Sequence, residues 1–133
     1  WLSTMTCPVL NRPTSGCLSG PNWRLEQWCL AATQIGIPTV DCSRSTRGGV
    51  APRTSSETVT VTMVGRTITG SADEAVERHT RQLAAVASVD AMTATFLRTP
   101  DGLRFAGACP FVDAGSQDVR RAIVGYFTGR MAT

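Results

Sequence analysis

Two stretches of alternating residues, each close to a stretch with helical spacing, place the strongest constraint on the fold. In TVTVTM, Val59, Val61 and Met63 alternate with threonines, which predicts a half-buried strand. Gly65-Arg66 follows as a tight turn into a second short strand, TIT. AMTATFL and LRFAGACPF, joined by the turn TPDG, predict a second hairpin. Antiparallel hairpins are therefore the expected framework.

Three stretches have helical spacing. The first follows Asn22, the second follows a capping box of Ser71 and Glu74, and the third follows Ser116 with Asp118 in its first turn. The order helix, two strands, helix, two strands, helix predicts an α+β two-layer sandwich, with an antiparallel sheet of about four strands and helices packed on one face. The expected inner face of the first helix comprises Leu25, Trp28, Cys29, Ala32 and Ile35.

The length of 133 residues predicts a single domain spanning residues 1–133. Within it, residues 1–21 form a Cys- and Pro-rich segment that predicts irregular structure. No apolar run approaches the roughly 18 residues that a membrane-spanning helix needs. The chain starts at Trp1 without a basic and apolar leader, so we interpret it as a mature product whose targeting segment has been removed.

Residues 43–57 bury almost nothing and predict a flexible surface loop. Its arginines, Arg44, Arg47 and Arg53, are candidates for contact with a target. All thirteen basic residues of the chain are arginines and the net charge is only +3. Because these arginines are spread along the chain rather than clustered, no specific nucleic-acid partner is expected.

Five cysteines in a short chain favour an oxidising compartment. There is no CxxC motif, and the single histidine, His79, lies on a different predicted element, so no metal site is expected. An odd number leaves one cysteine unpaired. The five are Cys7, Cys17, Cys29, Cys42 and Cys109.

The predicted faces favour a bridge between Cys29 and Cys109. Cys29 shares a helix face with Trp28, and Cys109 shares a strand face with Phe105 and Phe111, so both should point into one core. The alternative is that Cys109 is a reduced core thiol. The remaining cysteines could form Cys7–Cys42 or Cys7–Cys17.

No catalytic residue, metal or cofactor is assigned. His79 lies between Val76 and Leu83 on the inner side of its helix, which is typical of a half-buried structural histidine. Ser71 and Ser116 are explained as helix caps, and no phosphate-binding or nucleophile motif occurs. We therefore expect a protein that is not an enzyme.

The stretch from Leu103 to Ile123 resembles the Hce-type secreted fungal effectors, the necrosis-inducing factors, in which a Gly-x-Cys-x-Phe strand precedes a Gly-x-Gln-Asp-Val/Ile helix start. The resemblance implies that Cys109 pairs with a cysteine on an earlier helix, here Cys29 in EQWCLAATQI. It also implies a likeness to the compact α/β killer toxins of fungi. The matching residues are Gly107, Cys109, Phe111, Gly115, Gln117, Asp118, Val119 and Ile123.

Together these observations predict a secreted, disulfide-stabilised effector or killer-toxin-like protein that binds a protein or cell-surface target on another cell. The alternative is a small extracytoplasmic ligand-binding domain or hydrolase that uses His79 and the 43–57 loop.

Overall fold

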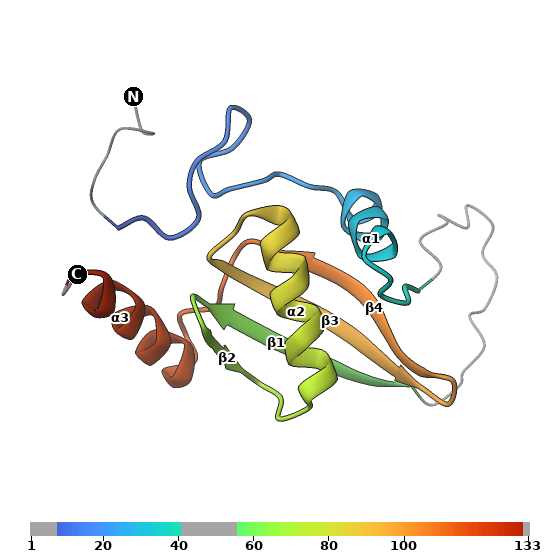
Figure 1. Ribbon diagram of the computed structural model, residues 1–133. Coiled ribbons are helices and arrows are strands. Elements are labelled where there is room, and N and C mark those ends of the chain that lie inside the picture. Colours follow the sequence, from blue (N-terminus) through green and yellow to red (C-terminus); the bar gives the residue numbers. More distant parts are fainter. Residues whose placement is uncertain (1–7, 41–55, 132–133) are drawn as a thin grey trace.

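The computed structural model describes residues 8–40 and 56–131 and contains helices on a four-stranded antiparallel sheet (Figure 1). This confirms the predicted α+β class and the order of the elements. Within the described ranges, no helix has the length and hydropathy needed to cross a membrane. The elements are α1 (Leu25–Gln34), β1 (Glu57–Val64), β2 (Thr67–Thr69), α2 (Glu74–Ala87), β3 (Ala91–Thr99), β4 (Gly102–Cys109) and α3 (Gln117–Met131).

The strands lie in the order β2-β1-β3-β4, and every neighbouring pair is antiparallel. The alternation predicted for β1 is confirmed, because Val61 and Met63 are buried while Thr58 and Thr60 are exposed. The tight turn at Gly65-Arg66 is confirmed as well, since β1 pairs with β2 directly across it.

The first face of the sheet carries α1 and α2 (Figure 1). Trp28 of α1 and Leu83 of α2 are fully buried against strand residues such as Phe96 and Phe105. This cluster is the main hydrophobic core, and burying side chains of this size stabilises the fold by about 1.5–3 kcal/mol each.

Helix α3 packs on the second face, so the expectation that all helices lie on one face is wrong. Val64 comes directly after Met63, and Ala91 comes directly before Met92, and both methionines face the main core. Because successive side chains of a strand alternate between its faces, Val64 and Ala91 point to the second face. Both are buried there against Val119 and Ala122 of α3. Helix α3 thus packs on the sheet through a small apolar patch at one end of the sheet.

A β-bulge in β4 reverses the predicted orientation of Cys109. Phe105 lies opposite Phe96, but Gly107, two residues on, lies opposite Thr95, which neighbours Phe96 on β3. The extra residue changes which side chains share a face, as one-residue shifts in a strand do. Cys109 consequently points to the second face and is exposed rather than packed in the core.

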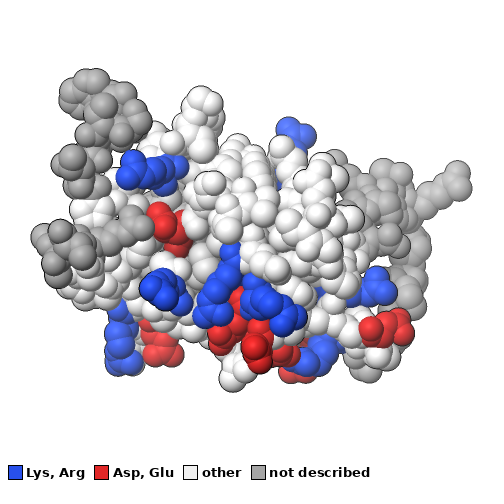
Figure 2. All heavy atoms as spheres, viewed as in Figure 1, with Lys and Arg blue, Asp and Glu red and all other residues white. Residues whose placement is uncertain are grey.

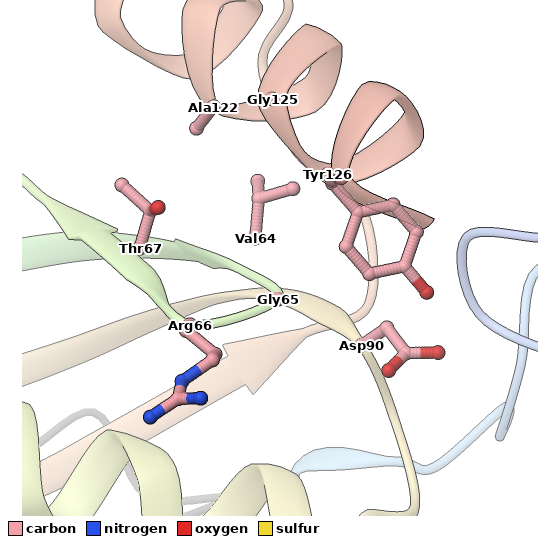
Figure 3. Close-up of a pocket in the computed structure, with 9 residues that line it drawn as sticks. Val64, Gly65, Arg66, Thr67, Asp90, Ala122, Gly125 and Tyr126 are labelled. Atoms are coloured by element: carbon pink, nitrogen blue, oxygen red, sulfur yellow. The ribbon is translucent and has the colours of Figure 1, made fainter. Parts of the chain in front are cut away.

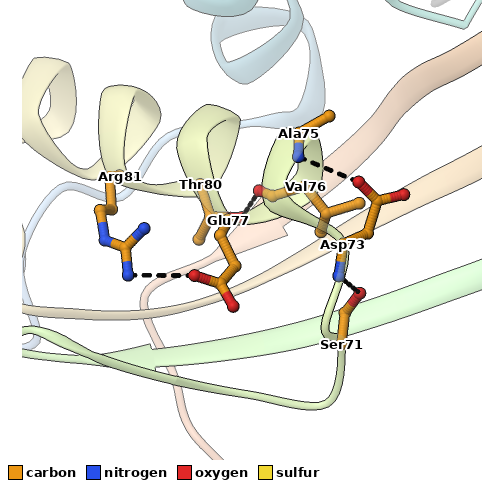
Figure 4. Close-up of polar contacts among 7 residues, drawn as sticks. All are labelled: Ser71, Asp73, Ala75, Val76, Glu77, Thr80 and Arg81. Atoms are coloured by element: carbon orange, nitrogen blue, oxygen red, sulfur yellow. Dashed lines mark hydrogen bonds and ion pairs between the residues drawn. The ribbon is translucent and has the colours of Figure 1, made fainter.

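The cap of α2 also differs from the prediction. Asp73, not Ser71, is the capping residue, because its Oδ1 accepts a hydrogen bond from the Ala75 N–H at 2.9 Å. Ser71 Oγ accepts from the Asp73 N–H at 3.0 Å and holds the approach to the helix (Figure 4). The other Asp73 oxygen pairs with Arg98 at 2.8 Å, and that hydrogen bond lowers the pKa of the Asp73 carboxyl.

The buried side chain of Asn11 ties the N-terminal segment to the sheet. Its Nδ2 donates to the carbonyls of Ala91 at 2.7 Å and Pro110 at 2.8 Å. Its Oδ1 accepts from the N–H groups of Asp90 at 2.8 Å and Ala91 at 2.7 Å. Every donor and both lone pairs of the amide are therefore used.

We expect Asn11→Gly to lower the free energy of unfolding by about 2–4 kcal/mol, because it leaves several buried backbone groups without partners. Glycine tolerates the positive φ of 57° at this position, so the loss reports the hydrogen bonds. Asn11→Ala adds backbone strain and should lose about 1 kcal/mol more. Urea unfolding measures both; a loss below 1 kcal/mol for Asn11→Gly would contradict this role.

Candidate functional site

A hollow lies between the β1–β2 turn and α3 (Figure 3). Its volume is about 380 Å³. The hairpin forms one wall and the face of α3 forms the other. The lining residues are Val64, Gly65, Arg66, Thr67, Asp90, Ala122, Gly125, Tyr126 and Gly129.

Close packing of Tyr126 against the turn defines one end of this hollow. Gly65 has a φ of +59°, and a β-carbon there would lie 2.6 Å from Cδ2 of Tyr126, so only glycine allows the ring to sit where it does. The Gly65 N–H donates to the Asp90 carbonyl at 2.6 Å. The Tyr126 hydroxyl donates to the Val9 carbonyl at 3.3 Å, which anchors α3 to the N-terminal segment.

Gly125 and Gly129 of α3 behave differently from Gly65. A β-carbon at either position would meet no atom of another described segment within 4 Å. Packing within the described chain therefore does not require glycine at these positions. Each glycine nevertheless costs the helix about 1 kcal/mol relative to alanine. Their effect is to leave the hollow open.

A second hollow, of about 360 Å³, continues from the first along β2 and shares Thr67, Ala122 and Gly125 with it. We call the two together the α3 groove. Its far end reaches Asp118 and Arg121, which form an exposed ion pair with a 3.7 Å separation. Such a pair contributes little to stability, and it leaves little net charge at that end.

The centre of the α3 groove is apolar, and charged residues lie at its margins: Asp90 and Arg66 line the first hollow, and Asp118 and Arg121 line the second. Val64, Thr67, Ala122 and the Tyr126 ring lie between the hairpin and α3, whereas the Arg66 side chain points away from the helix (Figure 3). Methyl, hydroxyl and aromatic groups next to bare helix backbone can accommodate a neutral segment. The Asp90 carboxylate lies at the end of the hollow where the Tyr126 ring packs (Figure 3).

Charged residues on the face that carries α2 gather low on that face, with both signs interspersed (Figure 2). The ion pairs of the described residues include Arg98 with Asp73 and Glu57, and Arg81 with Glu77 of α2, the latter drawn in Figure 4. Mixed signs do not make the continuous basic surface that nucleic acid requires.

The predicted Cys29–Cys109 bridge is wrong. Cys109 and Cys17 carry free thiols, whereas Cys29 is disulfide-bonded. The bulge explains the error, because it turns Cys109 away from the core that contains Cys29. The free thiol of Cys17 also contradicts a Cys7–Cys17 bridge, while Cys7 and Cys42 lie outside the described residues.

The predicted target-contact arginines, Arg44, Arg47 and Arg53, also lie outside the described residues, as does most of the 43–57 loop. His79 is half-buried, as predicted, and its ring centroid lies 6.3 Å from that of Phe96. It lines neither part of the α3 groove. In the described parts of the chain, no group of three or more potential metal-ligating side chains occurs.

The α3 groove was missed by sequence reasoning. The available signal was the pair of glycines four residues apart, Gly125 and Gly129, within a stretch otherwise predicted as helix. Helical glycines acquire meaning only when the space beside them is known, because the same spacing also serves close helix packing.

No protein-family model matches the chain, and no curated protein matches its sequence. Among solved structures, the fold is similar to that of the macrocyclase MdnB from Microcystis aeruginosa MRC, with a TM-score of 0.57 and 12% identity. That match covers 78% of this chain and 54% of MdnB, so the chain spans about half the length of that protein. The macrocyclase MdnC of the same organism, solved with the precursor peptide MdnA, matches with a TM-score of 0.45 and 15% identity, over 54% of this chain and 30% of MdnC.

We expect the stability of the protein to fall as the pH drops through the range of a normal histidine, about 6.5 and below. Burial, followed by the charge of Arg78, lowers the pKa of His79. The unfolded chain then binds a proton that the folded chain resists, so stability is full above about pH 6.5 and declines below it. Urea unfolding at pH 7.5 and 5.5 measures the effect in wild type and in His79→Gln. If the free energy of unfolding falls by the same amount between the two pH values in both proteins, the prediction is contradicted.

Proposed function

We propose that this protein acts by binding a macromolecular target on another cell through the α3 groove, as a secreted, disulfide-stabilised effector or killer-toxin-like protein. The observation that carries the proposal is the pair of helical glycines, Gly125 and Gly129, facing a hollow that nothing in the described chain fills. A helix that forgoes about 1 kcal/mol at each position keeps a surface that its own packing does not use.

The chemistry of the groove supports binding rather than catalysis. Its centre is lined by Val64, Thr67 and Ala122, its one end carries the Asp90 carboxylate, and the charged groups at its far end, Asp118 and Arg121, are paired with each other. Small-molecule sites are usually enclosed, whereas the hollow along β2 is broad and open, which suits a segment of a larger partner.

The cysteines support the secreted part of the proposal. Cys29 is disulfide-bonded and buried in the main core beside α2 and β4 residues. A disulfide at such a position is typical of proteins from oxidising compartments. We take the fold similarity to the macrocyclase MdnB as a likeness of architecture, because half of that protein's length has no counterpart here.

The alternative, a ligand-binding domain or hydrolase built on His79, has less support. The His79 Nδ1 is buried and has no hydrogen-bond partner among the described residues, so no neighbouring acid or nucleophile orients it. Its lowered pKa has burial as the leading cause, which fits a structural residue.

Gly125→Leu tests the groove directly. A β-carbon there meets no atom within 4 Å, so a leucine side chain should extend into the hollow, and its higher helix propensity should raise the free energy of unfolding by about 1 kcal/mol. Fluorescently labelled wild-type protein should bind fungal or plant cells saturably, and Gly125→Leu should weaken that binding at least about tenfold.

Val124→Leu is the matched control, because it adds bulk to the same helix at a side chain that is 61% exposed. It should bind as wild type does. Saturable binding by none of the cell types, or equal binding by Gly125→Leu and Val124→Leu, would refute the proposal.

The disulfide can be tested separately. Because Cys17 and Cys109 are free, peptide mapping without reductant should link Cys29 to Cys7 or Cys42. Cys29→Ala should lower the free energy of unfolding by about 2–5 kcal/mol, the usual loss for a native disulfide in a small secreted domain. Five titratable thiols after unfolding without reductant would contradict both the bridge and the secreted assignment.

A further inference from the structure

We infer that the ligand of the α3 groove is an extended polypeptide segment that pairs with the outer edge of β2 and places alternate side chains in the groove. The inference rests on the proposed function, since it names the class of partner for the same site. It is carried by the way the fold treats the two edges of its sheet.

The edge formed by β4 is covered at its middle, around Phe105, by the chain itself. The Phe105 N–H donates to the Pro38 carbonyl at 2.7 Å, and the Val40 N–H donates to the Phe105 carbonyl at 2.9 Å. The segment after α1 therefore runs along β4 as a parallel strap. Covering an edge in this way prevents other chains from pairing with it.

The edge formed by β2 has no such cover within the described residues. Strand β2 stands at the end of the order β2-β1-β3-β4 and pairs only with β1. The residues that close the two-residue turn, Val64 and Thr67, are opposite each other and form the hydrogen-bonded pair of the hairpin. Hydrogen-bonded and non-hydrogen-bonded pairs alternate along an antiparallel ladder, so the next pair, Met63 and Ile68, is a non-hydrogen-bonded pair. The N–H and C=O of Ile68 therefore point away from β1, toward the free edge of the sheet.

An extended peptide complements these two backbone groups, whereas a helix satisfies its own and cannot. Successive side chains of an added strand point to opposite faces of the sheet. Those on the second face would enter the hollow that Thr67, Thr69, Ala122 and Gly125 line beside β2. The edge and the hollow thus make one site in which backbone pairing provides affinity and the hollow provides selectivity.

The charges around the groove favour a peptide over nucleic acid. Arg121 is paired with Asp118, the Arg66 side chain points away from α3, and Asp90 adds a carboxylate, so the described side chains place no cluster of cations at the groove (Figure 3). Without cations to neutralise phosphates, a nucleic-acid strand gains little there. An extended segment of a protein fits both the backbone edge and the threonine and alanine side chains that line the groove beside β2.

The probe is a random peptide library on phage, selected on wild-type protein in the presence of excess Gly125→Leu protein. An enriched sequence is then made as a synthetic peptide. We expect it to bind wild type and Val124→Leu equally and Gly125→Leu at least about tenfold more weakly. Bound peptide should slow the hydrogen exchange of the Ile68 N–H, observed by NMR.

N-methylation of the peptide separates strand addition from other ways of filling the groove. Two peptides are made, one methylated on the backbone nitrogens of its odd-numbered residues and the other on those of its even-numbered residues. In one peptide the methyl groups replace the N–H donors that face β2, and in the other they replace the N–H donors that face solvent. One set should therefore lose binding and the other should keep it, with no change to the protein.

Three outcomes decide the matter. Selective loss by one methylated set together with protection of Ile68 supports strand addition. A peptide that discriminates Gly125→Leu but shows neither effect overturns strand addition and leaves groove binding intact. A selection that yields no peptide able to discriminate Gly125→Leu overturns the peptide inference, while the cell-binding comparison judges the proposed function independently.

Discussion

The four hydrogen bonds of the buried Asn11 amide hold together the end of the sheet on which the candidate site is built. They join a segment near the N-terminus to Asp90, to the first residue of β3 and to the residue after β4, across about 80 to 99 positions of sequence. The neighbours of Asn11 depend on this attachment: Leu10 packs in the cluster under α3, and the Val9 carbonyl receives the Tyr126 hydroxyl. Since Tyr126 forms the end of the α3 groove, the amide positions the groove although it does not line it.

The β-bulge in β4 is the second feature on which the architecture depends. Before it, Phe105 faces the main core; after it, Cys109 faces the opposite side of the sheet. The chain leaves β4 toward α3, which lies on that opposite side. A strand without the extra residue would direct Cys109 into the core beside Cys29, as the simple alternation predicts, so one inserted residue separates the two cysteines.

Local patterns in the sequence were sufficient for the elements and insufficient for the site. The alternation in β1 and the turn at Gly65-Arg66 depend on neighbouring residues, and both were predicted correctly. Asn11 could not be recognised, because its partners, Asp90, Ala91 and Pro110, are remote in sequence and three of the four bonds go to backbone groups of one short stretch. The bulge has no residue signature beyond a glycine that a regular strand can also hold. The packing site of α3 likewise depends on Val64 and Ala91, which are single residues at the ends of strands. The alternation in the sequence does not indicate which helix covers them.

Stability and an open groove oppose each other in α3. The helix is held to the sheet by a small apolar patch, with Val119 and Ala122 on its side, and by the packing and hydroxyl bond of Tyr126. Replacing Gly125 with alanine would strengthen the helix, and a β-carbon at this position meets no atom within 4 Å. A chain with so modest an attachment would gain from that change if packing were its only requirement. The proposed function accounts for the glycine, because it leaves room in the groove for the side chains of a segment that pairs with β2.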